Sequence, residues 1–162
     1  NVTPTNIPDV LIIEPKFFGD IEIFFESFNQ QAFNEVTEQN VQFVQDNHSR
    51  SAKGVLRGLH YQIQQPQGKL VRVTSGGVFD VAVDIANHRQ LWVSAGFAHG
   101  FVVLSETADF LYKTTDYYAP EFERCIAWNT PDIGITWPID EKPQLSGKDQ
   151  QGVLLNNAEM FA

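Results

Sequence analysis

Cysteine is nearly absent from this sequence: Cys125 is the only one among 162 residues. A single cysteine excludes an intrachain disulfide, and it favours a reducing compartment. We expect Cys125 to be a small core residue. Residues 1–4 (NVTP) are largely polar and lack the pattern of a secretory signal. The expected location is therefore the cytoplasm.

Positive charge and long apolar runs are also scarce. The chain has 11 Lys and Arg against 20 Asp and Glu, which gives a net charge of −9. Such a chain is repelled by nucleic-acid phosphates and by anionic lipids. No apolar run approaches the roughly 20 residues that cross a bilayer as a helix. We therefore expect neither a nucleic-acid partner nor a membrane partner.

Bulky apolar residues are abundant instead. Hydrophobic residues make up 43% of the chain, including thirteen Phe and three Trp, so a sizeable core is expected within one domain over residues 1–162. Short apolar stretches alternate with Gly, Pro, Ser and Asn, which predicts many short strands joined by turns. This pattern favours an all-β sandwich or barrel with a few short helices.

The individual elements follow from the same pattern. Strands are expected at residues 10–13, 24–28, 41–46, 55–62, 69–74, 77–85, 90–93, 98–104, 108–115 and 126–128. One short helix is expected over 30–36, with Asn29 as its N-cap. The polar stretch 47–51 predicts a loop.

The stretch 56–62 (LRGLHYQ) places an arginine and a histidine in an apolar strand. His60 is either a core histidine or a general base that titrates near neutral pH. A buried Arg57 would need an anion, which a ligand would supply. In a regular strand the two side chains face opposite ways, and a bulge at Gly58 would turn both inward.

Further polar side chains follow on later strands. Lys69 is either a solvated strand end or a charge that stabilises a developing oxyanion. Tyr112 either packs or returns a proton opposite the base, and Tyr118 could stack on a flat ring of a ligand. A base, cations and a phenol on successive strands together indicate proton transfer on an anionic substrate.

Metal and nucleotide motifs are missing from the sequence. The histidines are His48, His60, His88 and His99. No two of them have the i, i+2 spacing of a cupin metal site, so no catalytic metal is expected. No glycine-rich phosphate loop and no Gly-x-Ser-x-Gly motif is present, which argues against nucleotide-fold and hydrolase functions.

Eight segments, in order along the chain, resemble one enzyme family. They are residues 43–49, 56–62, 67–73, 78–84, 96–101, 110–113, 116–118 and 145–149. With these segments the sequence resembles the dTDP-4-dehydrorhamnose 3,5-epimerases of dTDP-L-rhamnose synthesis. The resemblance implies a cupin-type double-stranded β-helix, or jelly roll, and a homodimer that exchanges N-terminal strands. It implies a dTDP-sugar as substrate and no cofactor.

The resemblance also implies roles for individual residues. His60 is the implied proton acceptor, oriented by Asp149, and Tyr112 the implied proton donor on the opposite face. Lys69 is implied to stabilise the enolate oxygen at C4. The implied substrate contacts are Glu26, Gln45, Asn47, Arg57, His99, Phe101, Tyr118, Glu123 and Lys148.

The sequence departs from the family at two places. After residue 20 the family carries an Arg-Gly pair that reaches the diphosphate, whereas this chain reads IEI at 21–23. Only residues 85–88 join the segments ending at Asp84 and beginning at Arg89, where the family has a further strand. Two alternatives therefore stay open. One is an enzyme that epimerises a single centre or isomerises the ketosugar; the other is a non-catalytic cupin that binds a sugar or nucleotide.

Overall fold

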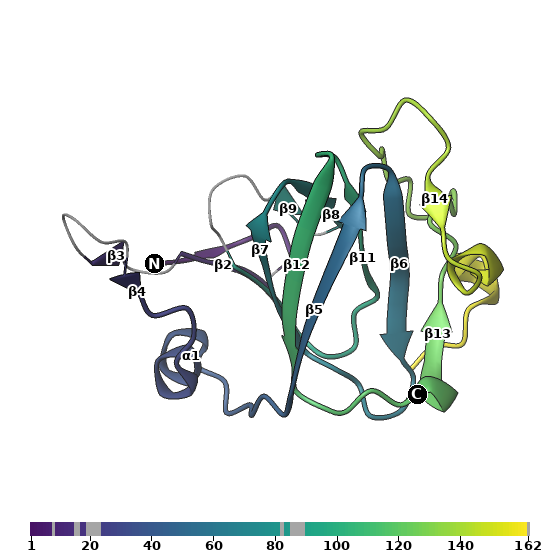
Figure 1. Ribbon diagram of the computed structural model, residues 1–162. Coiled ribbons are helices and arrows are strands. Elements are labelled where there is room, and N and C mark those ends of the chain that lie inside the picture. The colour runs from purple at the N-terminus through teal and green to yellow at the C-terminus, as the bar shows by residue number, and fades with distance from the viewer. Residues whose placement is uncertain (8, 15–16, 19–23, 82, 85–89, 162) are drawn as a thin grey trace.

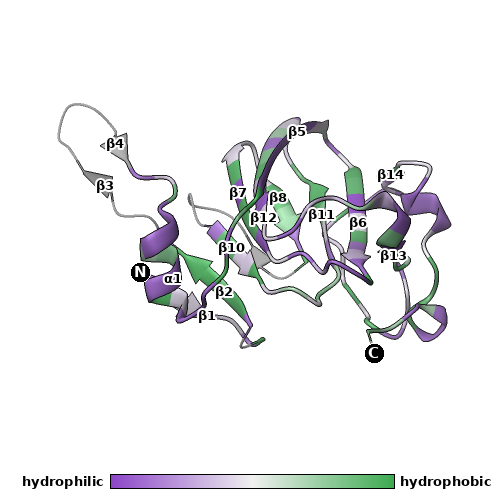
Figure 2. Ribbon diagram, turned by 90° about the horizontal axis from the view of Figure 1, so that it is seen from below, coloured by the Kyte–Doolittle hydropathy of each residue, from purple (hydrophilic) through white to green (hydrophobic). Residues whose placement is uncertain are grey.

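The computed structural model describes residues 1–161 except residues 8, 15–16, 19–23, 82 and 85–89. Two antiparallel sheets form the body of the molecule (Figure 1). Helix α1 and the small hairpin of β3 and β4 lie at one end of this body, and β13 and β14 lie at the other (Figures 1 and 2). The all-β class with a few short helices is thereby confirmed.

The first sheet has the order β1-β2-β10-β7-β12-β5. Its strands are β1 (Val2–Pro4), β2 (Val10–Ile13), β10 (Gln90–Val93), β7 (Lys69–Ser75), β12 (Thr107–Thr114) and β5 (Gln45–Ala52). The second sheet has the order β13-β6-β11-β8-β9, and β14 pairs with β6. Its strands are β13 (Glu123–Cys125), β6 (Val55–Gln62), β11 (His99–Val103), β8 (Val78–Asp80), β9 (Val83–Asp84) and β14 (Gln144–Leu145).

The remaining elements are short. They are the hairpin strands β3 (Phe17–Phe18) and β4 (Phe24–Phe25), the helix α1 (Gln30–Thr37), and the 3-10 helices η1 (Pro120–Phe122), η2 (Asp149–Gln151) and η3 (Leu155–Asn157). None of the described helices is long and apolar enough to cross a membrane.

The main core lies between the two sheets. Val71, Val73 and Leu91 come from the first sheet, and Val78 and Phe101 come from the second, and all five are buried in one cluster. Apolar side chains from both inner faces therefore pack against each other, as in other two-sheet folds. Figure 2 shows the hydrophobic character of β2 and β8, in contrast to the largely hydrophilic α1.

Helix α1 covers the outer face of the first sheet. Its N-cap is Asn29, whose side chain accepts a hydrogen bond from the backbone N–H of Ala32 at 3.0 Å, as the sequence predicted. Phe33 is the buried residue of the helix, and its ring meets that of Trp92 edge to face at a centroid distance of 5.0 Å. This aromatic contact holds the helix on β10.

Five predicted elements were wrong in detail. The strand expected at 24–28 covers only Phe24–Phe25, and the strand expected at 41–46 begins only at Gln45. Residues 47–51 are not a loop but the middle of β5, which pairs with β12 along its whole length. β5 lies at the edge of the sheet, where polar side chains are tolerated because one side of the strand faces solvent. The single strand expected at 77–85 is a hairpin of β8 and β9. The strand expected at 126–128 is β13, three residues earlier.

Both departures from the family pattern lie largely outside the described residues. Residues 19–23, where the family carries the Arg-Gly pair that this chain lacks, are not described. The same holds for residues 85–89, which form the short connection after β9.

Candidate active site

One cavity of about 480 Å³ lies between the two sheets. Strands β5, β7 and β12 of the first sheet contribute to its wall, as do β6 and β11 of the second. It gathers most of the residues that the sequence singled out: Gln45, Asn47, Arg57, His60, Lys69, His99, Phe101, Tyr112, Tyr118, Glu123, Lys148 and Asp149. Glu26 does not line it.

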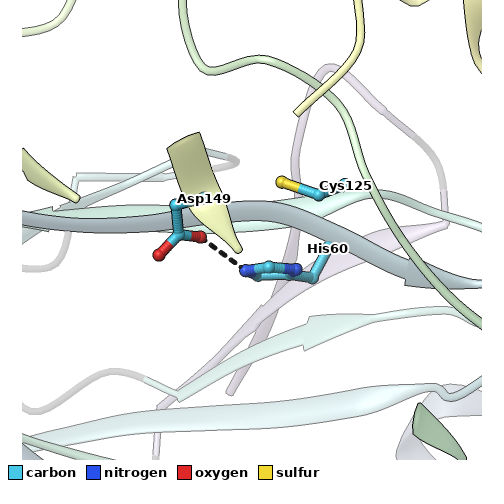
Figure 3. A group of neighbouring side chains, drawn as sticks. All are labelled: His60, Cys125 and Asp149. Carbon is cyan, nitrogen blue, oxygen red and sulfur yellow. Dashed lines mark hydrogen bonds and ion pairs between the residues drawn. The ribbon is translucent and has the colours of Figure 1, made fainter. Parts of the chain in front are cut away.

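His60 and Asp149 form a hydrogen-bonded pair in this cavity (Figure 3). The distance from Nε2 of His60 to Oδ1 of Asp149 is 2.7 Å. Asp149 is only 3% exposed, and it also accepts hydrogen bonds from the backbone N–H of Gly58 at 3.0 Å and from Ser146. Burial by itself would raise the pKa of Asp149, but these hydrogen bonds hold it well below its usual range. The carboxylate is therefore ionised and accepts the Nε2 proton.

The other ring nitrogen of His60 is left with a free lone pair. Nδ1 is buried and has no hydrogen-bond partner among the described residues. The nearest carboxylate oxygen, Oε1 of Glu123, lies 3.6 Å away. An imidazole held by a carboxylate at one nitrogen and free at the other is suited to accept a proton.

A bulge at Gly58 brings Arg57 and His60 to the same cavity, as predicted. On β11, His99 pairs with His60 and Phe101 pairs with Arg57, so three steps along β6 match two along β11. Gly58 has a φ of +133° there, in a region that favours glycine. Arg57 is not buried: its side chain lines the cavity but is exposed, because this bulged strand borders an open cavity.

Replacing Gly58 with alanine should destabilise the protein. The new Cβ would lie 2.5 Å from Cα of Gly100 and 3.0 Å from the carbonyl oxygen of His99. Overpacking costs about 1–3 kcal/mol and an unfavourable φ costs a similar amount, so we expect a loss of at least about 2 kcal/mol in urea unfolding. Gly77→Ala is the matched control, since its Cβ would meet nothing within 4 Å. Equal unfolding midpoints for both variants would contradict this prediction.

Lys69 lies next to the base. Its Nζ donates a hydrogen bond to the backbone oxygen of His60 at 3.3 Å. Burial lowers the pKa of Lys69 to about 8, although the carboxylates of Glu123 and Asp80 act in the opposite direction. The ammonium group remains protonated near neutral pH and can donate to a developing oxyanion.

Tyr112 belongs to the facing sheet. It lies on β12, whereas His60 lies on β6, and both line the cavity. Burial raises the pKa of the Tyr112 phenol, so it keeps its proton. Beside it Phe101 and Phe110 stack with centroids 3.9 Å apart and form an apolar part of the wall.

A second histidine–aspartate pair lies in the same wall. Nε2 of His99 lies 2.6 Å from Oδ1 of Asp80, and both residues are buried. The sequence did not indicate a role for Asp80, Ser146 or Phe110. The sequence places the carboxylate of Asp80 within an apolar strand, which could have drawn attention to it. The alternation of polar and apolar residues along that strand did not indicate which face would be buried.

A polar network borders the cavity near the base. Glu123 accepts two hydrogen bonds from Nζ of Lys148, both at 2.9 Å, and one from the Tyr118 hydroxyl at 3.0 Å. Gln45 accepts from the backbone N–H of Tyr118 at 3.0 Å and donates to Asn47 at 2.9 Å. Burial favours a higher pKa for Glu123, but Lys148 and His60 lower it, so the carboxylate stays ionised.

Two residues lie differently from expectation. Glu26 is exposed on the segment before α1, where it accepts a hydrogen bond from Asn29 at 3.2 Å, so its substrate contact stays a prediction. Cys125 is only partly buried and pairs with His60 across β13 and β6. Burial, together with the carboxylates of Asp149 and Glu123, raises the pKa of its thiol to about 12.

Comparison with known proteins shows the family of this chain. The family model described as dTDP-4-dehydrorhamnose 3,5-epimerase matches residues 4–88 and 85–157. The chain belongs to this family. It is 58% identical to the dTDP-4-dehydrorhamnose 3,5-epimerase of Pseudomonas aeruginosa, over 96% of each chain. It is 54% identical to that of Salmonella typhimurium, over 97% of this chain and 96% of the relative.

A solved structure of an epimerase is also closely similar. It is the dTDP-6-deoxy-D-glucose-3,5-epimerase of Legionella pneumophila in complex with dTDP-4-keto-L-rhamnose. The TM-score is 0.93 with 48% sequence identity, over 98% of this chain and 94% of the other. The cupin-type jelly roll is thereby confirmed.

The family model matches in two pieces that meet at residues 85–88, where the sequence predicted a shortened connection. The alignment to the Pseudomonas epimerase spans 173 residues, more than the 162 of this chain. The relative therefore carries residues that have no counterpart here. The cavity residues His60, Lys69, Tyr112 and Asp149 all lie in matched segments on either side of this point.

Proposed function

We propose that this protein converts dTDP-4-dehydro-6-deoxy-D-glucose to dTDP-4-dehydro-L-rhamnose by epimerising C3 and C5 in dTDP-L-rhamnose synthesis. Family membership supports the reaction, and the sugar nucleotide bound by the Legionella relative supports the ligand class. The observation that carries the proposal is the arrangement of the cavity. A carboxylate-held base, His60, and a phenol, Tyr112, come from facing sheets, with the ammonium of Lys69 beside the base.

The proposed reaction begins at Nδ1 of His60. The C4 ketone acidifies the C–H bonds at C3 and C5, and Nδ1 removes one of these protons. Asp149 stabilises the imidazolium that forms, because its carboxylate accepts the Nε2 proton at 2.7 Å. Lys69 donates a hydrogen bond to the enolate oxygen. Tyr112 then gives its proton to the opposite face of the carbon, which inverts it, and solvent restores both groups.

The proposed substrate contacts use the remaining side chains of the cavity. Arg57 is an exposed cation in the wall, and it would pair with the diphosphate. Lys148 would assist it, and Tyr118 would stack on a ring of the ligand. Gln45, Asn47, His99, Phe101 and Glu123 would complete the contacts.

A labelling experiment tests the proposal. The protein is incubated with dTDP-4-dehydro-6-deoxy-D-glucose in deuterated water, and deuterium is located by NMR. We expect deuterium at both C3 and C5 together with formation of dTDP-4-dehydro-L-rhamnose. Deuterium at one carbon would favour the single-centre alternative. Binding by calorimetry without any exchange would favour the non-catalytic cupin.

Tyr112→Phe should separate the two proton transfers. His60 can still remove and return a proton on its own side, so deuterium should still enter the substrate. Inversion should slow by about 10²–10⁴-fold, the usual contribution of a general acid. Tyr117→Phe is the matched control, because Tyr117 is 63% exposed and does not line the cavity. Product formation at the normal rate in the Tyr112 variant would assign the acid elsewhere.

The proposed assembly is a homodimer in the cytoplasm. A second copy that exchanges N-terminal strands would give Glu26 a route to a cavity that it does not reach within its own chain. Light scattering coupled to gel filtration measures the mass in solution, and a monomer at working concentration would contradict this assembly.

A further inference from the structure

The thiol of Cys125 and the carboxylate of Asp149 lie close to the imidazole of His60. His60, Cys125 and Asp149 each offer one ligand atom, and these three atoms all lie within 4.8 Å of one another (Figure 3). They come from three elements, β6, β13 and η2. The β6–β13 pairing and the hydrogen bond that Asp149 accepts from the backbone N–H of Gly58 on β6 hold these elements together. The Cys125 thiol has no part in the proposed epimerisation.

We propose that this cluster is a binding site for Zn²⁺ that switches the enzyme off. The ligands would be Nε2 of His60, Sγ of Cys125 and a carboxylate oxygen of Asp149, with water as the fourth. Nitrogen, sulfur and oxygen are the three ligand types that Zn²⁺ takes, at about 2.0–2.3 Å. Tetrahedral geometry then places the ligand atoms roughly 3.5 Å apart, so side-chain movements of about 1 Å suffice.

The surroundings of the cluster suit a bound cation. Metal-bound histidines usually donate their other ring N–H to a carboxylate, and Oε1 of Glu123 lies 3.6 Å from Nδ1 of His60. Two cations near the cluster are already paired with carboxylates. Lys148 bonds Glu123 at 2.9 Å, and Arg124 bonds Glu159 at 2.7 Å.

The cation would have its own route to the cluster. A second cavity of about 240 Å³ is lined by Cys125 and Val153 and also reaches His60 and Glu123. Cys125 does not line the substrate cavity, whereas His60 lines both. Asp149 lines the substrate cavity, and the two cavities share His60, Glu123 and Lys148. Zn²⁺ can therefore approach the cluster through the second cavity, beside the substrate.

Binding would change the protonation of the base. The proton on Nε2 moves to Nδ1 when the metal takes Nε2, and the thiol releases its proton to solvent. Nδ1 then donates to Glu123 and has no lone pair with which to remove a substrate proton. This consequence rests on the proposed role of His60, whereas binding of the metal does not.

Metal binding is tested without turnover. Equilibrium dialysis of the full chain should show one high-affinity Zn²⁺ per chain, and Co²⁺ as a spectroscopic probe should give a thiolate-to-metal absorption band. Cys125→Ser and Cys125→Ala should both abolish the band. Both should weaken Zn²⁺ binding by more than the roughly 10- to 100-fold that loss of an outer-shell partner costs. His48→Ala, which removes an exposed histidine, is the control and should bind normally.

Activity provides the second measurement. Zn²⁺ should inhibit the wild-type enzyme, while both Cys125 variants should stay active at the same Zn²⁺ concentration. Unchanged Zn²⁺ affinity in these variants, or a Co²⁺ complex without the thiolate band, would overturn the site. A thiolate band without inhibition would support the site and overturn its role as an off switch, whereas the His60→Ala variant tests the base separately.

Discussion

Replacing His60 with alanine should abolish deuterium exchange at both C3 and C5 and lower turnover by about 10²–10⁴-fold. A single base serves both carbons in the proposed reaction, so the two exchanges should disappear together. The other described histidines, His48 and His99, also line the cavity and bond carboxylates, so exchange that persists in the variant would assign the base to one of them.

The alanine variant needs a control for folding. Removing the imidazole leaves the buried carboxylate of Asp149 without one of its donors, which costs stability as well as activity. His60→Gln keeps an N–H donor for Asp149 but has no basic nitrogen, so it should fold and still lose both exchanges. Calorimetric binding of dTDP reports an intact cavity. Exchange at one carbon in either variant would require a second base.

Lys69→Met should lower turnover by about 10²–10³-fold, the usual cost of removing one donor to an oxyanion. The same group predicts a pH dependence for the wild-type enzyme. Because burial lowers the pKa of Lys69 to about 8, kcat/KM should fall as pH rises through this value. The variant should lose this alkaline limb. An exposed lysine changed in the same way, Lys53→Met, should leave rate and pH profile unaltered.

The stability of the Lys69 variant should move in the opposite direction to its activity. The folded-state pKa of about 8 is below the ordinary 10.5, so the folded protein binds this proton less tightly than the unfolded chain. Keeping Lys69 charged in the folded protein therefore lowers the free energy of unfolding at pH values below about 8. This cost disappears as the pH rises from about 8 towards 10.5. At neutral pH the methionine variant should unfold no more easily than the wild type. A clear loss of stability there would contradict the lowered pKa.

The sequence anticipated the architecture well but erred at its edge. Short apolar stretches with turn residues predicted the strands at 10–13, 55–62 and 90–93, and the structure has them with the same bounds. The polar residues 47–51 were expected in a loop, yet they form part of β5. An edge strand is held by backbone hydrogen bonds to one neighbour and needs no apolar face, so side-chain patterns do not reveal it.

The sequence by itself determined the fold class and the chemical types at the site. Alternation and turn residues are local properties, and the family motifs around His60, Lys69 and Tyr112 are contiguous in the chain. Only the tertiary structure decided which groups meet. His60 and Asp149 are 89 residues apart, and the position of Cys125 beside them follows from strand pairing. Such contacts depend on register and on the bulge at Gly58, because a shift of one residue turns a side chain to the other face.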